Sequence, residues 1–318
     1  VQQDIYNLGN LDASEANITL DGNQTQEITG KSLSFGELEV NNTNGVTINL
    51  DADEVLYIDS ILRVTDGNLN TGNALYMRCD FTNGAAQIDE VGGSISGNIT
   101  TEQCFPAKRA FRFIASSVTT STYIRDNWQE GVNNLSNTVA ANQNPNPGYG
   151  THITGSMTGA NGFDATTSGN PSLFELDNIN QTWVTTTNTN STTLTAGYPY
   201  RIMIRGDRSV DVLDNETSPT DTRLRNTGTV ATGNVNFSSG FSSTEGHFNF
   251  FGNPYHAIVD MTQVLENAGS TNVNTLYYYI WDPTQGTQGA YVTIDLQTNT
   301  STCLLYTSPS PRDRQKYR

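Results

Sequence analysis

Residues 36–60 read "GELEVNNTNGVTINLDADEVLYIDS", in which short apolar runs are separated by Asn, Asp and Gly. Apolar side chains recur at every second position, which is the pattern of β-strands with one buried face. Asn, Asp and Gly favour turns that need a positive φ. The same pattern continues from about residue 18 to residue 99, with almost no helix signal. The alternating positions are Leu38 and Val40, then Val46, Ile48 and Leu50, then Val55, Tyr57 and Ile61.

This strand pattern predicts stacked coils. About three strands fall within every 20 to 25 residues or so, a spacing that is typical of solenoid proteins. We therefore expect residues 1–97 to form a β-solenoid of about four coils. A β-sandwich built from the same hairpins is the alternative.

The pattern changes near "GGSISGNITTEQC", residues 92–104, and the predicted domain boundary lies there. Beyond it, many strands with turns about 8 to 12 residues apart predict a jelly-roll-like β-sandwich over residues 98–302, so the whole chain is expected to be all-β. A helical turn at 121–131 and a helix at 258–269, with Ile258, Met261 and Leu265 on one face, are the exceptions. The strands expected are 105–118, 198–208, 233–239, 247–255, 275–283 and 290–296.

The charge of the chain restricts its partners. The formal net charge is −16, and Asn and Thr fill about a quarter of the positions. A nucleic-acid partner is not expected, because phosphate binding needs a cationic face. Membrane insertion is not expected either, because no apolar run reaches the roughly 18 to 20 residues of a membrane span. This acidity fits an extracellular protein or one on the outer cell surface, where salt screens self-repulsion.

Three cysteines, Cys79, Cys104 and Cys303, match no zinc or redox motif. A bond between Cys79 and Cys104 is compatible with an oxidising exterior. Two separate buried thiols are the alternative.

Acidic and Arg-Gly-Asp motifs are interpreted as structural. Arg205-Gly206-Asp207 directly follows an alternating strand, so a turn is favoured over an exposed integrin-binding loop. Asp211, Asp214 and Glu216 offer the hard oxygen ligands of calcium, but their spacing does not match a calcium loop. Residues 51–54, "DADE", are a weaker case. We therefore predict no metal or cofactor residue, with calcium as the alternative.

The three histidines, His152, His247 and His256, match no catalytic motif, so no catalytic residue is assigned. His256 and Asp260 have the spacing of a pair on one helix face, although a contact at the start of the helix is favoured. Paired carboxylates of a polysaccharide lyase or hydrolase depend on the fold and remain an alternative.

A group of aromatic residues could stack on sugar rings. However, Tyr277, Tyr279 and Trp281 alternate on one strand face, and such a face is also typical of a buried core. The group consists of Trp128, Trp183, Trp281, Tyr277, Tyr278 and Tyr279.

Six blocks, in one order, resemble a module of large secreted surface proteins from Bacteroidetes-type bacteria. In those proteins the module commonly precedes a type IX secretion sorting domain. The blocks are "GNITTEQCFPAKRAFRFIASSVTTSTYIRDNWQEG" (97–131), "GYGTHITG" (148–155), "GFDATTSGNPSLFEL" (162–176), "GYPYRIMIRGDR" (197–208), "TRLRNTGTVATGNV" (222–235) and "FFGNPYHAIVDM" with "YYYIWDP" (250–261 and 277–283).

The resemblance implies export across the outer membrane and display or release outside the cell, and it implies no catalytic residue. Cys104 stands where the module has a tyrosine, which argues for a lone thiol. The first function predicted is a non-enzymatic segment of an adhesin-like surface protein that contacts extracellular polysaccharide or cell-surface components. The alternative is a carbohydrate-binding accessory module of a larger enzyme that degrades polysaccharide.

The end of the chain, residues 303–318, differs from everything before it. It is basic, and "CLLYTSPSPRD", residues 303–313, matches the translation of a transposase-based sequencing adapter. We therefore expect residues 303–318 to be a non-native tail and the chain to be a fragment.

Overall fold

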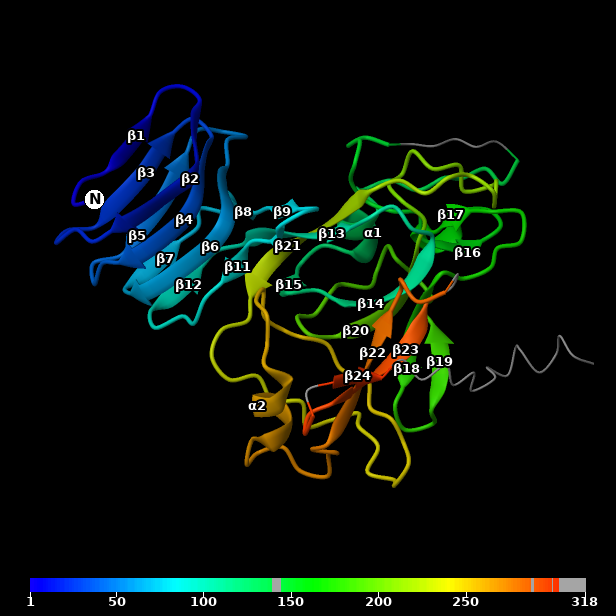
Figure 1. Ribbon diagram of the computed structural model, residues 1–318. Coiled ribbons are helices and arrows are strands. Elements are labelled where there is room, and N and C mark those ends of the chain that lie inside the picture. Colours follow the sequence, from blue (N-terminus) through cyan, green and yellow to red (C-terminus); the bar gives the residue numbers. More distant parts are fainter. Residues whose placement is uncertain (139–143, 287–288, 299, 303–318) are drawn as a thin grey trace, which may run out of the picture.

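A computed structural model describes residues 1–138, 144–286, 289–298 and 300–302. The predicted non-native tail, with Cys303, lies outside these residues. The fold is all-β, and its N-terminal part is a β-solenoid of about four turns, as predicted (Figure 1). Among the described residues, no helix has the length and apolar character needed to cross a membrane.

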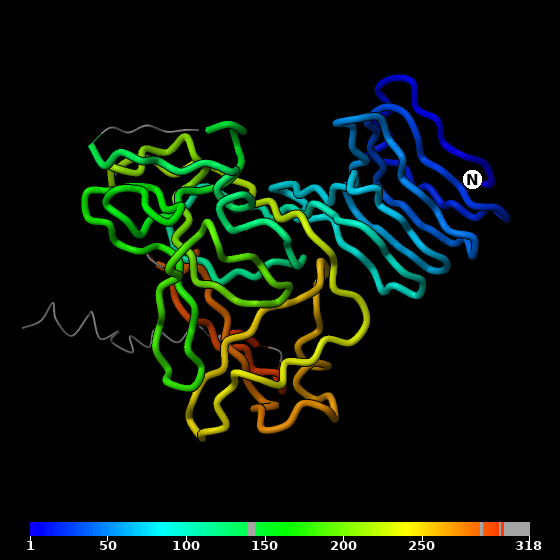
Figure 2. Tube along the Cα trace, turned by 180° about the vertical axis from the view of Figure 1, so that it is seen from behind, coloured from blue at the N-terminus to red at the C-terminus, as the bar shows by residue number. Residues whose placement is uncertain are grey.

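The solenoid consists of two stacks of parallel strands, whose successive turns lie side by side in Figure 2. One stack follows the order β1-β3-β5-β7-β12, and the other contains β2-β4-β6-β8-β13. The first comprises β1 (Ile5–Asn7), β3 (Gln26–Gly30), β5 (Val46–Leu50), β7 (Asn68–Asn70) and β12 (Ser94–Ser96). The second comprises β2 (Leu11–Leu20), β4 (Leu33–Asn41), β6 (Leu56–Asp66), β8 (Leu75–Met77) and β13 (Ile99–Phe105).

Bulges divide the long strands of the second stack, so each coil contains three strand segments. The register of β4 shifts between Phe35 and Glu37, where Gly36 lies. A Cβ on Gly36 would lie 2.5 Å from the backbone oxygen of Ser14, so the bend requires glycine here. In the coil after β6 the segments are separate strands: β8 pairs with the first half of β6, and β11 (Gln87–Ile88) pairs with its second half.

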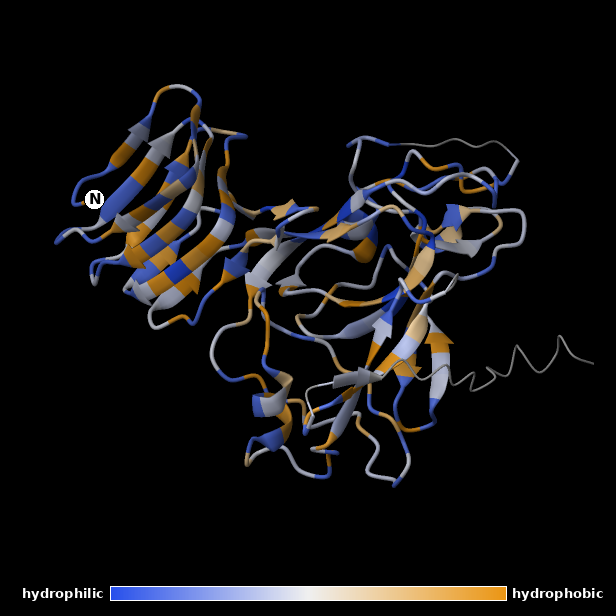
Figure 3. Cartoon of the chain, in the orientation of Figure 1, coloured by the Kyte–Doolittle hydropathy of each residue, from blue (hydrophilic) through white to orange (hydrophobic). Residues whose placement is uncertain are grey.

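The core of the solenoid is a set of stacked apolar rows, visible as alternating colours along the strands in Figure 3. One row follows the register Leu33, Leu56, Leu75 and Ile99. The predicted phase of β6 is wrong, because Leu56, Ile58 and Leu62 are buried whereas Val55, Tyr57 and Ile61 are only half-buried. In "VLYI", residues 55–58, both sets of alternate positions contain apolar residues. Only packing against the apolar rows of the neighbouring coils decides which set points into the core.

β13 connects the solenoid to the rest of the chain. Its first three residues pair in parallel with β8, and all seven pair in antiparallel fashion with β21 (Thr222–Val230). β15 (Val118–Thr120) pairs with the other edge of β21. The second stack of the solenoid therefore continues as one sheet into the C-terminal half.

A disulfide between Cys79 and Cys104 lies at this connection. Cys79 begins β9 (Cys79–Asp80), which forms a hairpin with β10 (Gly84–Ala85) inserted after β8. The buried carboxylate of Glu102 on β13 accepts a hydrogen bond from the Cys79 amide, 3.1 Å long. The lone thiol that the family resemblance implied for Cys104 is therefore wrong, because the hairpin carries Cys79 to β13.

Small sheets and long loops make up the C-terminal half, for which a jelly-roll-like sandwich remains a prediction. One sheet has the strand order β14-β20-β18-β19, another has β22-β23-β24, and β16 pairs with β17. The strands are β14 (Ala110–Ala115), β16 (Thr154–Ser156), β17 (Asp164–Ala165), β18 (Leu173–Asp177), β19 (Thr182–Thr185), β20 (Pro199–Ile204), β22 (Tyr277–Asp282), β23 (Ala290–Asp295) and β24 (Thr300–Thr302). The helices are α1 (Ile124–Trp128), α2 (Met261–Glu266) and the short 3-10 helix η1 (Ala160–Gly162).

Two of the predicted strands, 233–239 and 247–255, are irregular instead. Their backbone bonds to side chains rather than to a neighbouring strand: the amides of Phe248 and Phe250 donate to Gln181 and Asn178. The helical turn at 121–131 is confirmed by α1. The helix predicted at 258–269 is confirmed only as α2, and Ile258 is exposed outside it.

The disulfide gives a first testable prediction. Replacing both Cys79 and Cys104 with Ser should lower the free energy of unfolding by about 3 to 4 kcal/mol, because the bond closes a loop of 25 residues in the unfolded chain. Chemical denaturation, with the disulfide-intact protein as reference, measures the difference. Two free thiols in the native, unreduced protein would contradict the bond itself.

Candidate functional site

The outer side of the sheet β14-β20-β18-β19 carries a group of aromatic side chains, here called the aromatic face. The opposite side of the same strands packs into the core of the C-terminal half, where Tyr200, Ile202 and Ile204 are buried. β22 and the irregular segment before α2, which carries Phe250, approach the aromatic face from outside. Its members are Phe111, Phe113, Phe174, Trp183, Phe250, Trp281 and Tyr291.

Phe113 is the centre of the aromatic face. Its ring lies 4.8 Å from that of Phe250 and 5.6 Å from that of Trp183, measured between centroids. Trp281 stacks on it at 5.5 Å, and Tyr291 meets it edge-on at 5.7 Å. These separations are those of favourable aromatic pairs, so the rings hold one another in fixed orientations.

Arg201 adds a positive charge to the aromatic face. Its guanidinium lies 4.0 Å above the ring centroid of Phe111 and 5.2 Å from that of Trp183. A cation above a ring is attracted by the negative π face, by about 0.5–1 kcal/mol at exposed sites and more where water is excluded. The aromatic face therefore combines flat apolar surfaces with a fixed donor of hydrogen bonds.

One edge of the aromatic face is open to solvent. Tyr291 is 46% exposed. On β22, two positions before Trp281, the cross-strand partner of Tyr291, Tyr279 is 49% exposed and packs against Phe248, with 5.4 Å between the ring centroids. Exposed apolar surface of this kind marks binding sites in soluble proteins, and a sugar ring could stack on it.

The structure brings together some of the predicted aromatic residues and not others. Trp183 and Trp281 meet at Phe113, and Tyr279 lies along the same strand as Trp281. Trp128 does not join them, because it is fully buried and packs edge-on against Tyr200.

Sequence reasoning missed Phe113, Phe250 and Tyr291. The alternation in "AFRFIA" gave the signal for Phe113. Phe111 and Phe113 point outward, whereas Ile114 and the buried Arg112 share the inner side.

Arg205-Gly206-Asp207 forms a turn, as predicted, and not an exposed tip. Gly206 has a φ of 133°, which favours glycine, and Asp207 is buried. The carboxylate of Asp207 accepts hydrogen bonds from the amides of Ser209 and Gly148. An integrin could not reach this carboxylate without opening the turn.

The residue after the turn, Arg208, belongs to a fully buried charged cluster. Both of its terminal nitrogens donate to the carboxylate of Asp164, at 3.0 and 2.8 Å. Nδ1 of His152 lies 3.4 Å from the same carboxylate, and Nε2 donates to the backbone oxygen of Arg208. Burial would raise the pKa of Asp164, but the contacts with His152 and Arg208 outweigh it and lower the pKa to about 2.

The other two histidines also make structural contacts. His256 lies 2.9 Å from the hydroxyl of the buried Ser117, and burial lowers its pKa to about 4. It does not pair with Asp260, which caps the start of α2 by accepting from the amide of Thr262, as favoured from the sequence. His247 contacts Ser242 on an exposed loop.

Two of the candidate calcium ligands accept hydrogen bonds from backbone amides of their own loop. Asp211 accepts a hydrogen bond from the amide of Leu213, and Asp214 accepts one from the amide of Glu216. In the described part of the chain, no three His, Cys, Asp or Glu residues are grouped closely enough to hold a metal ion. Calcium binding at this loop stays an untested alternative.

The buried cluster gives a second testable prediction. Replacing Asp164 with Asn should lower the free energy of unfolding at pH 7 by about 3 to 5 kcal/mol, because Arg208 would lose its buried partner. The pKa of Asp164 is depressed on folding, so its stabilisation is present above pH 4 and is lost as the pH falls toward 2. The gap between variant and wild type should therefore shrink over that range, as measured by urea denaturation.

Asp59 provides the matched control, since its ion pair with Arg78 is partly exposed. Replacing Asp59 with Asn should cost under about 1 kcal/mol at pH 7. Equal losses for the two variants would contradict the role given to the buried cluster.

The aromatic face is, among the described residues, the arrangement that best fits a binding role, because it combines the exposed ring of Tyr291 with a fixed positive charge. Comparison of the chain with protein-family models, with curated proteins and with solved structures finds no match in any of the three.

Proposed function

We propose that this chain is a non-enzymatic segment of a secreted, adhesin-like surface protein exported by type IX secretion. Its partner is extracellular polysaccharide, bound at the aromatic face. The observation that carries the proposal is the solvent-exposed edge of that face, where Tyr291 and Tyr279 leave ring surface uncovered beside Trp281. The flat faces of sugar rings are apolar, and rings held in fixed orientations lose little entropy when they bind.

Three further features support an extracellular site of action. The Cys79–Cys104 bond fits an oxidising compartment, since disulfides persist mainly in exported proteins. The net charge of −16 fits a salt-screened exterior. The resemblance to secreted surface modules also supports an extracellular location.

The rigid connection between the two halves of the chain is consistent with a solenoid that presents the aromatic face to a partner outside the cell. β13 is part of the solenoid and of the following sheet, so the solenoid would hold the aromatic face at a fixed distance and angle.

A carbohydrate-binding accessory module of a larger polysaccharide-degrading enzyme is the second candidate. The same aromatic face favours it, because such modules also bind sugars through aromatic rings. The two candidates differ in what the parent protein carries beyond this chain. Adhesion by the purified chain supports the first, and a catalytic domain in the same gene supports the second.

The proposed partner gives a third testable prediction. On an array of neutral and acidic glycans, the chain should bind at least one glycan saturably, and Trp281→Ala should weaken that binding about tenfold or more. Loss of Trp281 removes the ring that packs against both Phe113 and the exposed Tyr291. Tyr6→Ala, which removes an exposed ring on the solenoid, is the control and should leave binding unchanged.

A fourth prediction concerns adhesion. Beads coated with the purified chain should attach to polysaccharide-coated surfaces more strongly than beads coated with an acidic protein of matched charge density. Trp281→Ala should reduce attachment to the control level. Attachment that does not exceed the acidic control, together with an empty glycan array, would refute the proposed function.

A further inference from the structure

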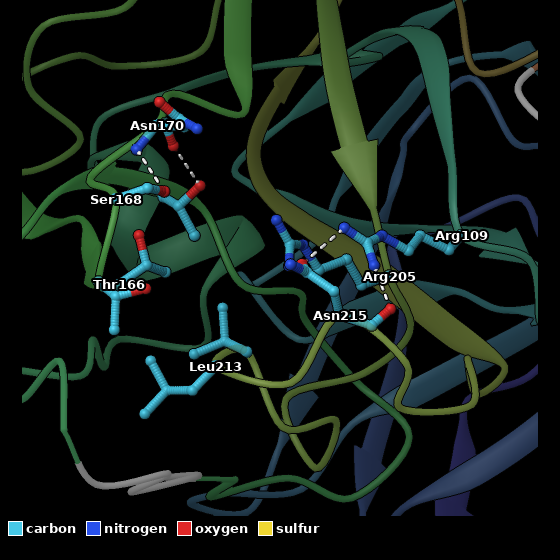
Figure 4. Close-up of a pocket in the computed structure, with 10 residues that line it drawn as sticks. Arg109, Thr166, Ser168, Asn170, Arg205, Leu213 and Asn215 are labelled. Carbon is cyan, nitrogen blue, oxygen red and sulfur yellow. Dashed lines mark hydrogen bonds between the residues drawn. The ribbon is translucent and has the colours of Figure 1, made fainter.

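A second site is formed by a polar cavity of about 260 Å³ where β14 begins and β20 ends. Figure 4 shows Arg109, Arg205 and Asn215 on one side of it. Thr166, Ser168 and Asn170 line the other side, and Leu213 provides an apolar part of the wall. None of its lining residues is acidic, although acidic residues outnumber Lys and Arg by 32 to 16 in the sequence.

The strand ladder places the two arginines together. Ala110, the first residue of β14, pairs with Ile204, the last residue of β20. Arg109 directly precedes β14 and Arg205 directly follows β20, so both lie at the same end of the ladder. Like charges at facing positions repel each other. Arg109 is held by Asn215, donating to its backbone oxygen and, at 3.0 Å, to its side-chain oxygen.

Arg205 has no such partner among the described residues. Its buried Nε lacks a hydrogen-bond acceptor, and none of the ion pairs in this part of the chain involves Arg205. Burial and the charge of Arg109 lower the pKa of Arg205 to about 10, so the guanidinium remains charged at neutral pH. A half-buried cation without an acceptor destabilises the free protein, which is a common property of groups that await a ligand.

We propose that this cavity binds an oxyanion group carried by a polar molecule no larger than a monosaccharide, such as the carboxylate of a hexuronic acid or the sulfate of a sulfated sugar. The planar guanidinium of Arg205 would donate to two oxygens of the anion at once. Thr166, Ser168 and Asn170 face it across the cavity and would bond to hydroxyl groups of the same molecule. The volume is slightly below the roughly 300 Å³ at which pockets for drug-sized ligands begin.

This inference does not rest on the aromatic face, whose members do not line the cavity. It goes beyond the proposed function by assigning a second site and an anionic ligand class to the same chain.

Isothermal titration calorimetry on the full chain at constant ionic strength provides the fifth testable prediction. The probes are sodium glucuronate, glucose 6-sulfate, sodium sulfate and glucose. Saturable binding of glucuronate identifies a carboxylate as the ligand group, and binding of glucose 6-sulfate or sulfate identifies a sulfate. Failure of all three anions to bind, or binding of glucose as strong as that of the anions, overturns the proposal.

Arg205→Gln tests the residue, and Arg63→Gln is the control with the same charge change, on the solenoid. Arg205→Gln should weaken anion binding about 10- to 100-fold, since hydrogen bonds to charged groups are lost. Its melting temperature without ligand should equal or exceed that of wild type, because an unpaired cation is removed. Arg63→Gln should bind the anion as wild type does.

Anion binding that survives Arg205→Gln overturns the proposal. A melting temperature of Arg205→Gln well below that of Arg63→Gln also overturns it, since Arg205 would then hold the fold. Glycan binding at the aromatic face should be unchanged by Arg205→Gln, and anion binding should be unchanged by Trp281→Ala. The two sites can therefore fail independently.

Discussion

β13 forms hydrogen bonds with both halves of the chain, and the placement of later elements depends on them. On one edge it continues the parallel stack through β8, and on the other it begins an antiparallel pairing with β21. A strand that belongs to two ladders cannot rotate relative to either one without breaking backbone hydrogen bonds. The disulfide to Cys79 and the bond from the Cys79 amide to Glu102 fix the same strand from the solenoid side. The C-terminal half is therefore attached rigidly and not through a linker.

The solenoid could be predicted from the sequence because its contacts repeat along the chain. Each strand packs against a neighbour about 20 to 26 residues away, as Leu33 does against Leu56, so one local pattern recurs in every coil. The face of each strand was harder to predict. Val55 and Leu56 are both apolar, and only the row formed with Leu33 and Leu75 selects Leu56 for the core.

The candidate sites could not be predicted in the same way, because they depend on contacts between distant residues. The indole nitrogen of Trp281 donates to the backbone oxygen of Phe111, 170 residues earlier. Asp164 and Arg208 are 44 residues apart and meet only through the loops of the C-terminal half. Residue type alone identifies Trp183 and Trp281 as candidates for binding a sugar ring. No local spacing showed that Phe113 would lie between them.

Arg205 and Arg208 belong to the same turn, but within the described part of the chain only the guanidinium of Arg208 has an acidic partner. Arg208 is fully buried, and its cost of desolvation is offset by two bonds to Asp164, which are aided by the contact of Asp164 with His152. Arg205, three residues earlier, feels the charge of Asp164 only from a distance and lies beside the like charge of Arg109. An arginine with a purely structural role in this turn could pair with an acidic residue, as Arg208 pairs with Asp164. The chain contains twice as many acidic residues as Lys and Arg residues. The turn instead leaves the guanidinium of Arg205 directed into a cavity lined by hydroxyl and amide groups, where an oxyanion from outside would supply the acceptor that the protein does not.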